Sequence, residues 1–210
     1  MDRTEPPDLL ETMLWKPEHS YVLGDRHLTR LLQSAAQLGY AVSGDRLAAA
    51  LHNASQQFLP HPQRVHLVVS PDGTPTVTAQ PLTPLPQPYR IPLAIAPVES
   101  SNPWLYHKTT QRDVYARAIA ATPHYSDVLL WNERGEVTES CIANLVVQIE
   151  GRFWTPPVSC GLLPGIYRQW LLEQGTLHPH VLAVEQLAHA QGLWLVNSVR
   201  AMWPIELVGL

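Results

Sequence analysis

Lys108 is the residue whose surroundings best suit covalent chemistry. It lies in the segment His107-Lys108-Thr109-Thr110, directly after aromatic and apolar residues. A lysine in dry surroundings loses its proton more easily and becomes a nucleophile. A surface lysine that happens to follow aromatic residues fits this one segment equally well, so Lys108 needs support from elsewhere in the chain.

Glu139 is the second candidate, and it precedes the apolar run over residues 141–148. A carboxylate that is partly buried there needs a cationic partner, and a protonated pyridine nitrogen would be one. The alternative is a solvated residue in a turn.

Two further features suit the binding of a phosphate. Pro164-Gly165 precedes a helical run at Ile166, and the free backbone N–H groups of a helix start bind anions. Arg30 lies one helical turn after Arg26, and a guanidinium offers a fixed fork of donors. An ordinary loop-to-helix junction and a solvated arginine are the alternatives.

Hydrophobic periodicity predicts the elements that position these residues. In the first part of the chain it predicts a strand over 9–15, a helix from 26 to Gly39, a helix capped by Ser43, and a hairpin over 66–70 and 76–80. Prolines then crowd residues 81–103, which predicts an extended connection with one short strand over 91–96.

The second part mixes strands and helices irregularly. It predicts helices over 114–121 and 166–174 and strands over 127–131, 141–148, 152–155 and 193–198. This pattern favours an α+β fold over a doubly wound sheet. We expect a small N-terminal lobe over residues 1–98 and a larger, β-rich lobe over 99–210.

The composition excludes several classes of function. The chain has 210 residues, 45% hydrophobic and 15% charged, and a net charge of -4 without a basic run. We therefore expect no nucleic-acid partner and no membrane span. Two cysteines, Cys141 and Cys160, suit a reducing cytoplasm and are expected to be buried. His178 and His180 have no third ligand, so we expect them to be exposed and predict no metal site.

The order and spacing of six segments resemble the class IV aminotransferases, which are fold-type IV pyridoxal-phosphate enzymes. The resemblance runs from about Leu9 to Leu207. Its segments are Glu11-Thr12-Met13, Arg26-His27-Leu28-Thr29-Arg30-Leu31, Lys108-Thr109-Thr110, Glu139-Ser140-Cys141-Ile142-Ala143-Asn144-Leu145, Leu162-Leu163-Pro164-Gly165-Ile166 and Asn197-Ser198-Val199-Arg200.

The resemblance implies a two-lobed fold with pyridoxal phosphate in the cleft, and it assigns roles to residues. Lys108 resembles the lysine that binds the cofactor covalently, Glu139 the partner of its pyridine nitrogen, and Arg30 the arginine on its phosphate. The remaining cofactor contacts that it implies are the backbone amides of Ile166 and Tyr167, the turn at Ser198 and Val199, Leu163 on the ring and Asn144 beside it.

Within the family, the first and last segments look most like aminodeoxychorismate lyases, including the lyase-like domain fused to the synthase that makes their substrate. The implied reaction converts 4-amino-4-deoxychorismate to 4-aminobenzoate and pyruvate, a step toward folate. A D-amino acid or branched-chain aminotransferase is the alternative, because the first steps are the same. A binding module that has kept the fold and lost catalysis is a third.

Other expectations concern the substrate and the assembly. Arg200 is the candidate clamp for a substrate carboxylate, with Asn197 and Thr12 nearby in the family arrangement; Arg64 and His66 are weaker candidates. Family members usually have about 25 to 30 further residues before the first strand, so the small lobe is expected to lack strands or to be completed by a partner. We still expect a homodimer, with an aminodeoxychorismate synthase as a candidate partner.

Overall fold

The computed structural model describes residues 6–209 and divides them into two compact units. The first unit comprises residues 6–83 together with His107–Gln111, and the second comprises Pro84–Tyr106 and residues 112–209. Residues 84–98 were expected in the first lobe. The structure groups them with the second unit because strand β5 (Arg90–Pro92) pairs in parallel with β13 (Glu206–Val208).

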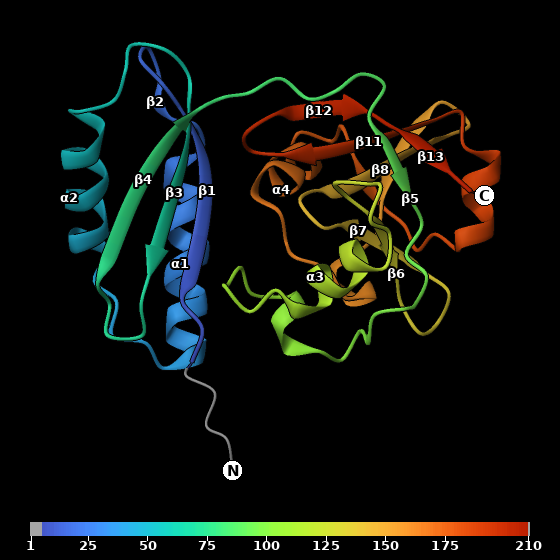
Figure 1. The fold of residues 1–210 in the computed structure, drawn as a ribbon, viewed down its shortest axis with the longest axis horizontal. Helices are drawn as coiled ribbons and strands as arrows, with labels where there is room; N and C mark the ends of the chain where they lie inside the picture. The colour runs from blue at the N-terminus through green and yellow to red at the C-terminus, as the bar shows by residue number, and fades with distance from the viewer. Residues whose placement is uncertain (1–5, 210) are drawn as a thin grey trace. The chain divides into compact units, whose positions relative to one another are not determined.

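The first unit is a four-stranded sheet with two helices. The strand order is β2-β1-β3-β4, and both β1 with β3 and β3 with β4 are antiparallel (Figure 1). The elements are β1 (Leu9–Lys16), β2 (Ser20–Tyr21), α1 (Gly24–Leu38), α2 (Gly44–Ser55), β3 (Gln63–Val69) and β4 (Pro75–Pro81). The strands, helices and hairpin predicted for this part of the chain are confirmed.

Local sequence signals explain where these helices begin and end. Gly39 ends α1 in a left-handed conformation, with φ of 75°, which a residue without a Cβ adopts without strain. The Ser43 side chain accepts a hydrogen bond from the backbone N–H of Arg46 and so caps α2.

Alternation along the strands decides which side chains face the helices. Leu9 and Met13 of β1 and Leu67 of β3 pack with Leu31 of α1 and Leu47 of α2 in one buried core. Because successive side chains of a strand point to opposite faces, the even-numbered residues of β1 and β3 lie on the other face of the sheet.

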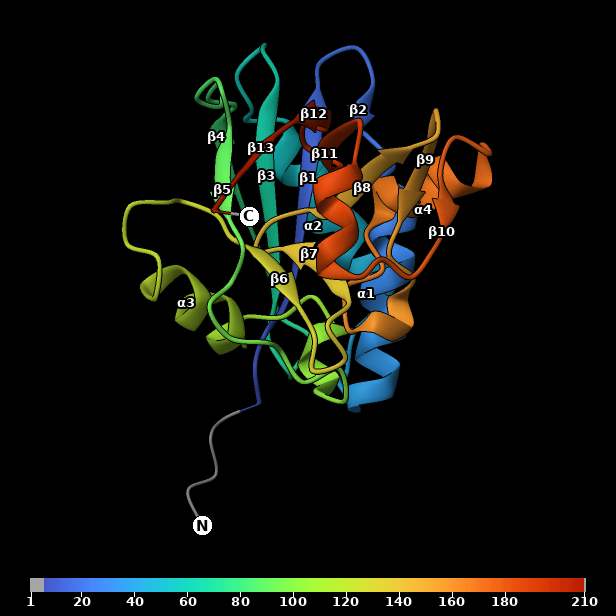
Figure 2. The same cartoon turned by 90° about the vertical axis from the view of Figure 1, so that its right-hand side faces the viewer.

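The second unit is built on a seven-stranded sheet. Its main path is β10-β9-β8-β11-β12, and β7 pairs with both β6 and β8 (Figure 2). The strands beyond β5 are β6 (Leu129–Trp131), β7 (Val137–Ser140), β8 (Asn144–Ile149), β9 (Arg152–Thr155), β10 (His178–Pro179), β11 (Gly192–Asn197), β12 (Ala201–Pro204) and β13. The helices are η1 (Pro103–Leu105), α3 (Asp113–Ala120), η2 (Val158–Cys160), α4 (Ile166–Glu173) and η3 (Val184–His189).

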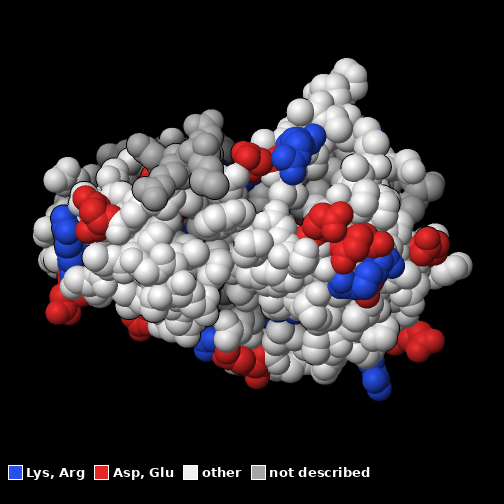
Figure 3. Space-filling view, turned by 90° about the horizontal axis from the view of Figure 1, so that it is seen from below, with Lys and Arg blue, Asp and Glu red and all other residues white. Residues whose placement is uncertain are grey.

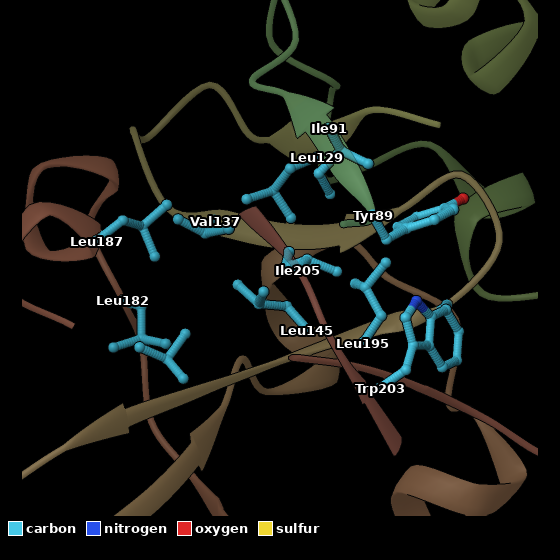
Figure 4. Close-up of a cluster of buried hydrophobic side chains, with 12 residues drawn as sticks. Tyr89, Ile91, Leu129, Val137, Leu145, Leu182, Leu187, Leu195, Trp203 and Ile205 are labelled. Carbon is cyan, nitrogen blue, oxygen red and sulfur yellow. The ribbon is translucent and has the colours of Figure 1, made fainter. Parts of the chain in front are cut away.

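The core of this unit brings together strands that are distant in sequence. Leu145 of β8 and Leu195 of β11 are directly opposite each other, and Val137, Trp203 and Ile205 surround them (Figure 4). Burial of these side chains is what holds β7 and β8 in place for the groups described below.

Two strand predictions for this unit were wrong in extent, and some of its strands were not predicted. Residues 141–148 do not form one strand: a turn separates β7 from β8, because the Ser140 hydroxyl accepts from the backbone N–H groups of Ile142 and Ala143. Glu139 therefore lies inside β7 rather than before a strand. The strand expected over 91–96 is limited to β5, and neither β12 nor β13 was predicted.

The surface carries charges of both signs, and both cysteines are buried. On the face in Figure 3, Lys and Arg side chains are interspersed with Asp and Glu rather than gathered in one patch. No helix among residues 6–209 is long and apolar enough to cross a bilayer. Cys141 and Cys160 are buried, as predicted, and burial raises the pKa of each thiol to about 12.

A buried ion pair ties α1 to β1 in the first unit. Glu11 is 1% exposed, and its two carboxylate oxygens accept hydrogen bonds from Nε and Nη2 of Arg30 at 2.8 and 2.6 Å. Nδ1 of His27 lies 2.7 Å from the same carboxylate. Burial by itself raises the pKa of Glu11, but Arg30 and His27 outweigh it and lower this pKa to about 2.

We predict that Glu11→Gln destabilises the protein by about 3 kcal/mol at neutral pH, because it removes the negative charge that is paired with the buried Arg30. A carboxylate whose pKa is lowered on folding stabilises above its unfolded pKa and loses this effect as the pH falls toward its folded pKa. The difference in the free energy of unfolding between the wild type and the variant should therefore shrink by about 1 kcal/mol between about pH 6 and about pH 3.5.

Urea denaturation of the wild type and the variant at both pH values measures this gap. Glu18→Gln, at an exposed position between β1 and β2, is the matched control and should change stability by less than about 0.5 kcal/mol. A gap that stays constant with pH contradicts the assignment of an ionised Glu11.

Candidate active site

The candidate site residues fall into two sets, one in each unit. Lys108, Arg30, Thr12 and Arg64 belong to the first unit. The second unit contains the remaining candidates, which are Glu139, Asn144, Leu163, Ile166, Tyr167, Asn197, Ser198, Val199 and Arg200.

Lys108 is held at its position by backbone pairing with the start of β1. Its carbonyl oxygen accepts from the N–H of Leu10 at 2.9 Å, and Thr109 forms an antiparallel bridge with Leu9. On the other side, Nδ1 of His107 lies 3.0 Å from the hydroxyl of Ser34 in α1. The lysine therefore projects from a backbone that is fixed before and after it, and its side chain is partly exposed.

Polar side chains from β1 and β3 are near Lys108. Thr12 is directly opposite His66 in the strand register, and its hydroxyl oxygen lies 3.4 Å from Nδ1 of His66. Arg64 donates from Nε to Nε2 of His66 at 2.8 Å. Burial lowers the pKa of His66, and the positive charges of Arg64 and Lys108 lower it further. The structure thus brings Thr12, Arg64 and His66 together on one face, within reach of the charge on Lys108.

Arg30 is oriented by the Glu11 fork described above. Nε and Nη2 are held by this carboxylate, which fixes the plane of the guanidinium. Glu11 was named only as part of a motif and was assigned no function, because no local pattern indicates that it contacts a residue 19 positions later.

Glu139 is a buried carboxylate with a set of neutral donors in the second unit. It is 4% exposed. Its Oε1 accepts from the hydroxyl of Tyr115 at 2.8 Å and from the backbone N–H of Leu163 at 3.1 Å, and its Oε2 accepts from Nδ2 of Asn144 at 3.1 Å. These contacts hold the carboxylate in one orientation at the pairing of β7 with β8, where Glu139 and Asn144 are register partners.

Asn144 connects Glu139 to the start of α4. Its Nδ2 also donates to the carbonyl oxygen of Leu163 at 2.9 Å. A Cβ built at Gly165 would lie 1.9 Å from Oδ1 of Asn144, so this close packing requires a glycine. The Leu-Pro-Gly segment therefore donates a backbone hydrogen bond to the Glu139 carboxylate and supplies the N-cap residue of α4.

The start of α4 presents backbone N–H groups without a side-chain cap. Gly165 is the N-cap residue, and no side chain among the described residues caps this helix. Arg168, one turn in, donates to the Thr155 hydroxyl at 3.1 Å and to the Pro156 carbonyl at 2.7 Å, which anchors α4 to the end of β9. The N–H groups of Ile166 and Tyr167 are the ones that such a helix start offers to an anion.

The turn after β11 is shaped by Asn197. Its Oδ1 accepts from the N–H groups of Val199 and Arg200 at 3.0 and 2.9 Å, and its Nδ2 donates to the carbonyl of Ile142 at 3.3 Å. The Asn197 amide is therefore engaged within the fold and shapes the turn that carries Ser198 and Arg200.

Tyr115 and Arg112 are the site residues that sequence reasoning missed in the second unit. The Arg112 guanidinium lies 4.3 Å from the centre of the Tyr115 ring, and Arg112 also donates to the Cys141 carbonyl. Burial raises the pKa of Tyr115 well above its usual value, and the nearby charge of Glu139 raises it further. The Tyr115 hydroxyl therefore keeps its proton and remains a hydrogen-bond donor. The sequence did hold one indication of Tyr115: it is a tyrosine on the predicted helix over 114–121, only seven residues after Lys108.

These residues fit pyridoxal phosphate. Glu139 is a buried carboxylate held in one orientation by Tyr115, Asn144 and the backbone of Leu163, and such a carboxylate is suited to a protonated ring nitrogen. The uncapped start of α4 and the ordered guanidinium of Arg30 are both suited to a phosphate. Lysine is the residue type that binds an aldehyde, and the sequence holds only two, Lys16 and Lys108.

Comparison with known proteins identifies the relatives of this chain. The family model for amino-transferase class IV matches residues 8–208. A candidate aminodeoxychorismate lyase of Schizosaccharomyces pombe is 33% identical over 210 residues, which covers 93% of this chain and 87% of the yeast protein.

Solved structures show the same likeness. The crystal structure of a candidate amino-acid aminotransferase from Mesorhizobium loti is 36% identical, with a TM-score of 0.91, and the match covers 97% of this chain and all of that one. A hypothetical aminotransferase from Mycobacterium tuberculosis, in its α-ketoglutarate- and PMP-bound form, is 25% identical with a TM-score of 0.79, over 96% of this chain and 81% of that one.

The family match spans nearly the whole chain, and the yeast relative exceeds 30% identity over most of both proteins. The predicted α+β fold of the class IV aminotransferases is confirmed. The chain belongs to the class IV aminotransferase family, and it is a pyridoxal-phosphate-dependent enzyme of the aminotransferase or lyase type.

Proposed function

We propose that this enzyme is an aminodeoxychorismate lyase, which converts 4-amino-4-deoxychorismate to 4-aminobenzoate and pyruvate. The observation that carries the proposal is the 33% identity to the yeast candidate lyase along nearly the full length of both chains. The reaction balances without water or a second substrate, because the substrate divides into the two products.

The proposed residue roles combine the family resemblance with the contacts seen within each unit. Lys108 binds the cofactor and, once displaced by the substrate amine, removes the proton from the amine-bearing carbon. Glu139, held by Tyr115 and Asn144, keeps the ring nitrogen protonated. Pyridoxal phosphate, when bound, supplies the electron sink for the bond that breaks at that carbon.

The phosphate and the ring have their own proposed contacts. The guanidinium of Arg30, oriented by Glu11, binds the phosphate, and the N–H groups of Ile166 and Tyr167 and the turn at Ser198 and Val199 complete the binding. Leu163 packs on the ring. Its backbone N–H donates to Glu139 and its carbonyl oxygen accepts from Asn144, so its position beside the proposed partner of the ring nitrogen is fixed.

Charge supports the choice of substrate. The substrate carries two carboxylates, and arginines are the side chains best suited to hold them. Arg64 lies beside His66 in the first unit, and Arg200 follows the turn that Asn197 shapes in the second. We propose these two arginines as the carboxylate contacts and Thr12 as a further substrate contact.

An aminotransferase is the second candidate, because the Mesorhizobium relative, at 36% identity, bears the name of an amino-acid aminotransferase. It would transfer the amine of a D- or branched-chain amino acid to a keto acid and release no 4-aminobenzoate. The third alternative, a non-catalytic binding module, is wrong, because the family membership shows an enzyme.

We predict that purified protein with pyridoxal phosphate forms 4-aminobenzoate and pyruvate in equal amounts from 4-amino-4-deoxychorismate. Fluorescence of the aromatic product and a lactate dehydrogenase assay measure the two. Lys108→Ala should lower the rate by at least about 100-fold while circular dichroism shows an unchanged fold. If no 4-aminobenzoate forms and an amino acid with 2-oxoglutarate gives a keto acid, the lyase proposal is wrong.

We propose that the enzyme acts in the cytoplasm as a homodimer, with an aminodeoxychorismate synthase supplying its substrate. The two buried free cysteines suit a reducing compartment, and the dimer rests on the resemblance to the family. Light scattering should give about twice the mass of the chain, and a monomeric mass at working concentration would contradict the dimer.

A further inference from the structure

His66 forms a hydrogen bond that determines where its proton lies. Nε2 of His66 is 2.8 Å from Nε of Arg64. A guanidinium can only donate hydrogen bonds and keeps its charge in proteins, so Nε2 of His66 must be the acceptor and must be unprotonated. A neutral His66 therefore carries its proton on Nδ1.

This proton determines the direction of the hydrogen bond to Thr12. Nδ1 of His66 lies 3.4 Å from the hydroxyl oxygen of Thr12, and strand register places the two residues directly opposite each other. Because Nδ1 is the donor, the Thr12 oxygen accepts, and the hydroxyl proton of Thr12 must point elsewhere. The chain of contacts from Arg64 through His66 thus makes Thr12 a hydrogen-bond donor.

The surroundings keep His66 neutral. A proton on Nε2 would face the N–H of Arg64, and the charge of Lys108 also acts on the imidazole. Thr12, Arg64 and His66 share the sheet face opposite the helices of the first unit, and Lys108 is paired through its backbone with the strand that carries Thr12.

We propose that His66 is a positioning residue: a neutral imidazole, protonated on Nδ1 and fixed by Arg64, that turns the Thr12 hydroxyl into a donor toward a substrate bound at Lys108. This rests on the proposed role of Lys108 and deepens it. The expected recipient is an oxygen that bears negative charge, either a substrate carboxylate or the oxygen through which its leaving group is attached.

The first test measures the tautomer and needs neither cofactor nor substrate. In ¹⁵N-histidine-labelled protein, the ring nitrogen shifts and their couplings to ring protons distinguish protonation at Nδ1 from protonation at Nε2. His66→Asn assigns the signal by its loss. We expect the Nδ1-protonated form at neutral pH, and Arg64→Leu should shift the proton to Nε2. An Nε2-protonated or fully protonated His66 in the wild type overturns the inference.

The second test uses two amides that each mimic one half of the imidazole. His66→Asn places an amide N–H near the position of Nδ1 and keeps the bond to Thr12, whereas His66→Gln extends to the position of Nε2 and loses it. We expect His66→Gln and Thr12→Val each to lower kcat about tenfold with KM within about twofold, and His66→Asn to stay within about threefold of wild type.

Combining His66→Gln with Thr12→Val should cost no more than either change alone, because both act through one hydroxyl. Additive losses, or Asn and Gln variants that are equally impaired, overturn the inference. Its failure is distinguishable from that of the proposed function: an enzyme that makes no 4-aminobenzoate can still show the Nδ1-protonated His66, and an active lyase can show the other tautomer.

Discussion

A carboxylate buried inside a protein must be held by fixed hydrogen-bond donors, and the candidate cofactor contacts of this chain depend on two such carboxylates. Glu11 in the first unit accepts both donors of the Arg30 fork and so orients the proposed phosphate ligand. Glu139 in the second unit accepts from Tyr115, Asn144 and the backbone of Leu163. Each carboxylate orders its neighbours before any ligand is present, which reduces the reorganisation that binding requires.

Strand β1 explains why three successive residues of the first motif have different tasks. Glu11 faces the helices and meets Arg30, Thr12 faces the opposite side and meets His66, and Met13 returns to the core. The period of two along a strand produces this division. The same strand pairs at its start with the backbone around Lys108, so one element supports the proposed phosphate arginine, the proposed substrate donor and the lysine.

The sequence predicted the elements that carry strong local signals. Gly39 and Ser43 mark the end of α1 and the start of α2, and the hairpin of β3 and β4 follows its turn residues. It failed where distant contacts decide the structure. β7 is a buried strand of mostly polar residues that shows no alternation, and β13 exists because it pairs with β5, more than a hundred residues earlier. The partners of Glu139 and Arg30 are likewise distant in sequence, so family resemblance indicated the site residues, while coordinates were needed to show what orients them.

The central claim is that Lys108 binds the cofactor, and the scarcity of lysine makes it directly testable. Lys16 is the one other lysine of the sequence, and it lies at the far end of β1, roughly 23 Å along the strand from the residue that pairs with Thr109. Borohydride reduction of the protein loaded with pyridoxal phosphate, followed by digestion and mass spectrometry, locates the modified lysine. We expect the label on the Lys108 peptide in the wild type and in Lys16→Arg, and none in Lys108→Arg; a label on Lys16, or one that persists in Lys108→Arg, would contradict the account.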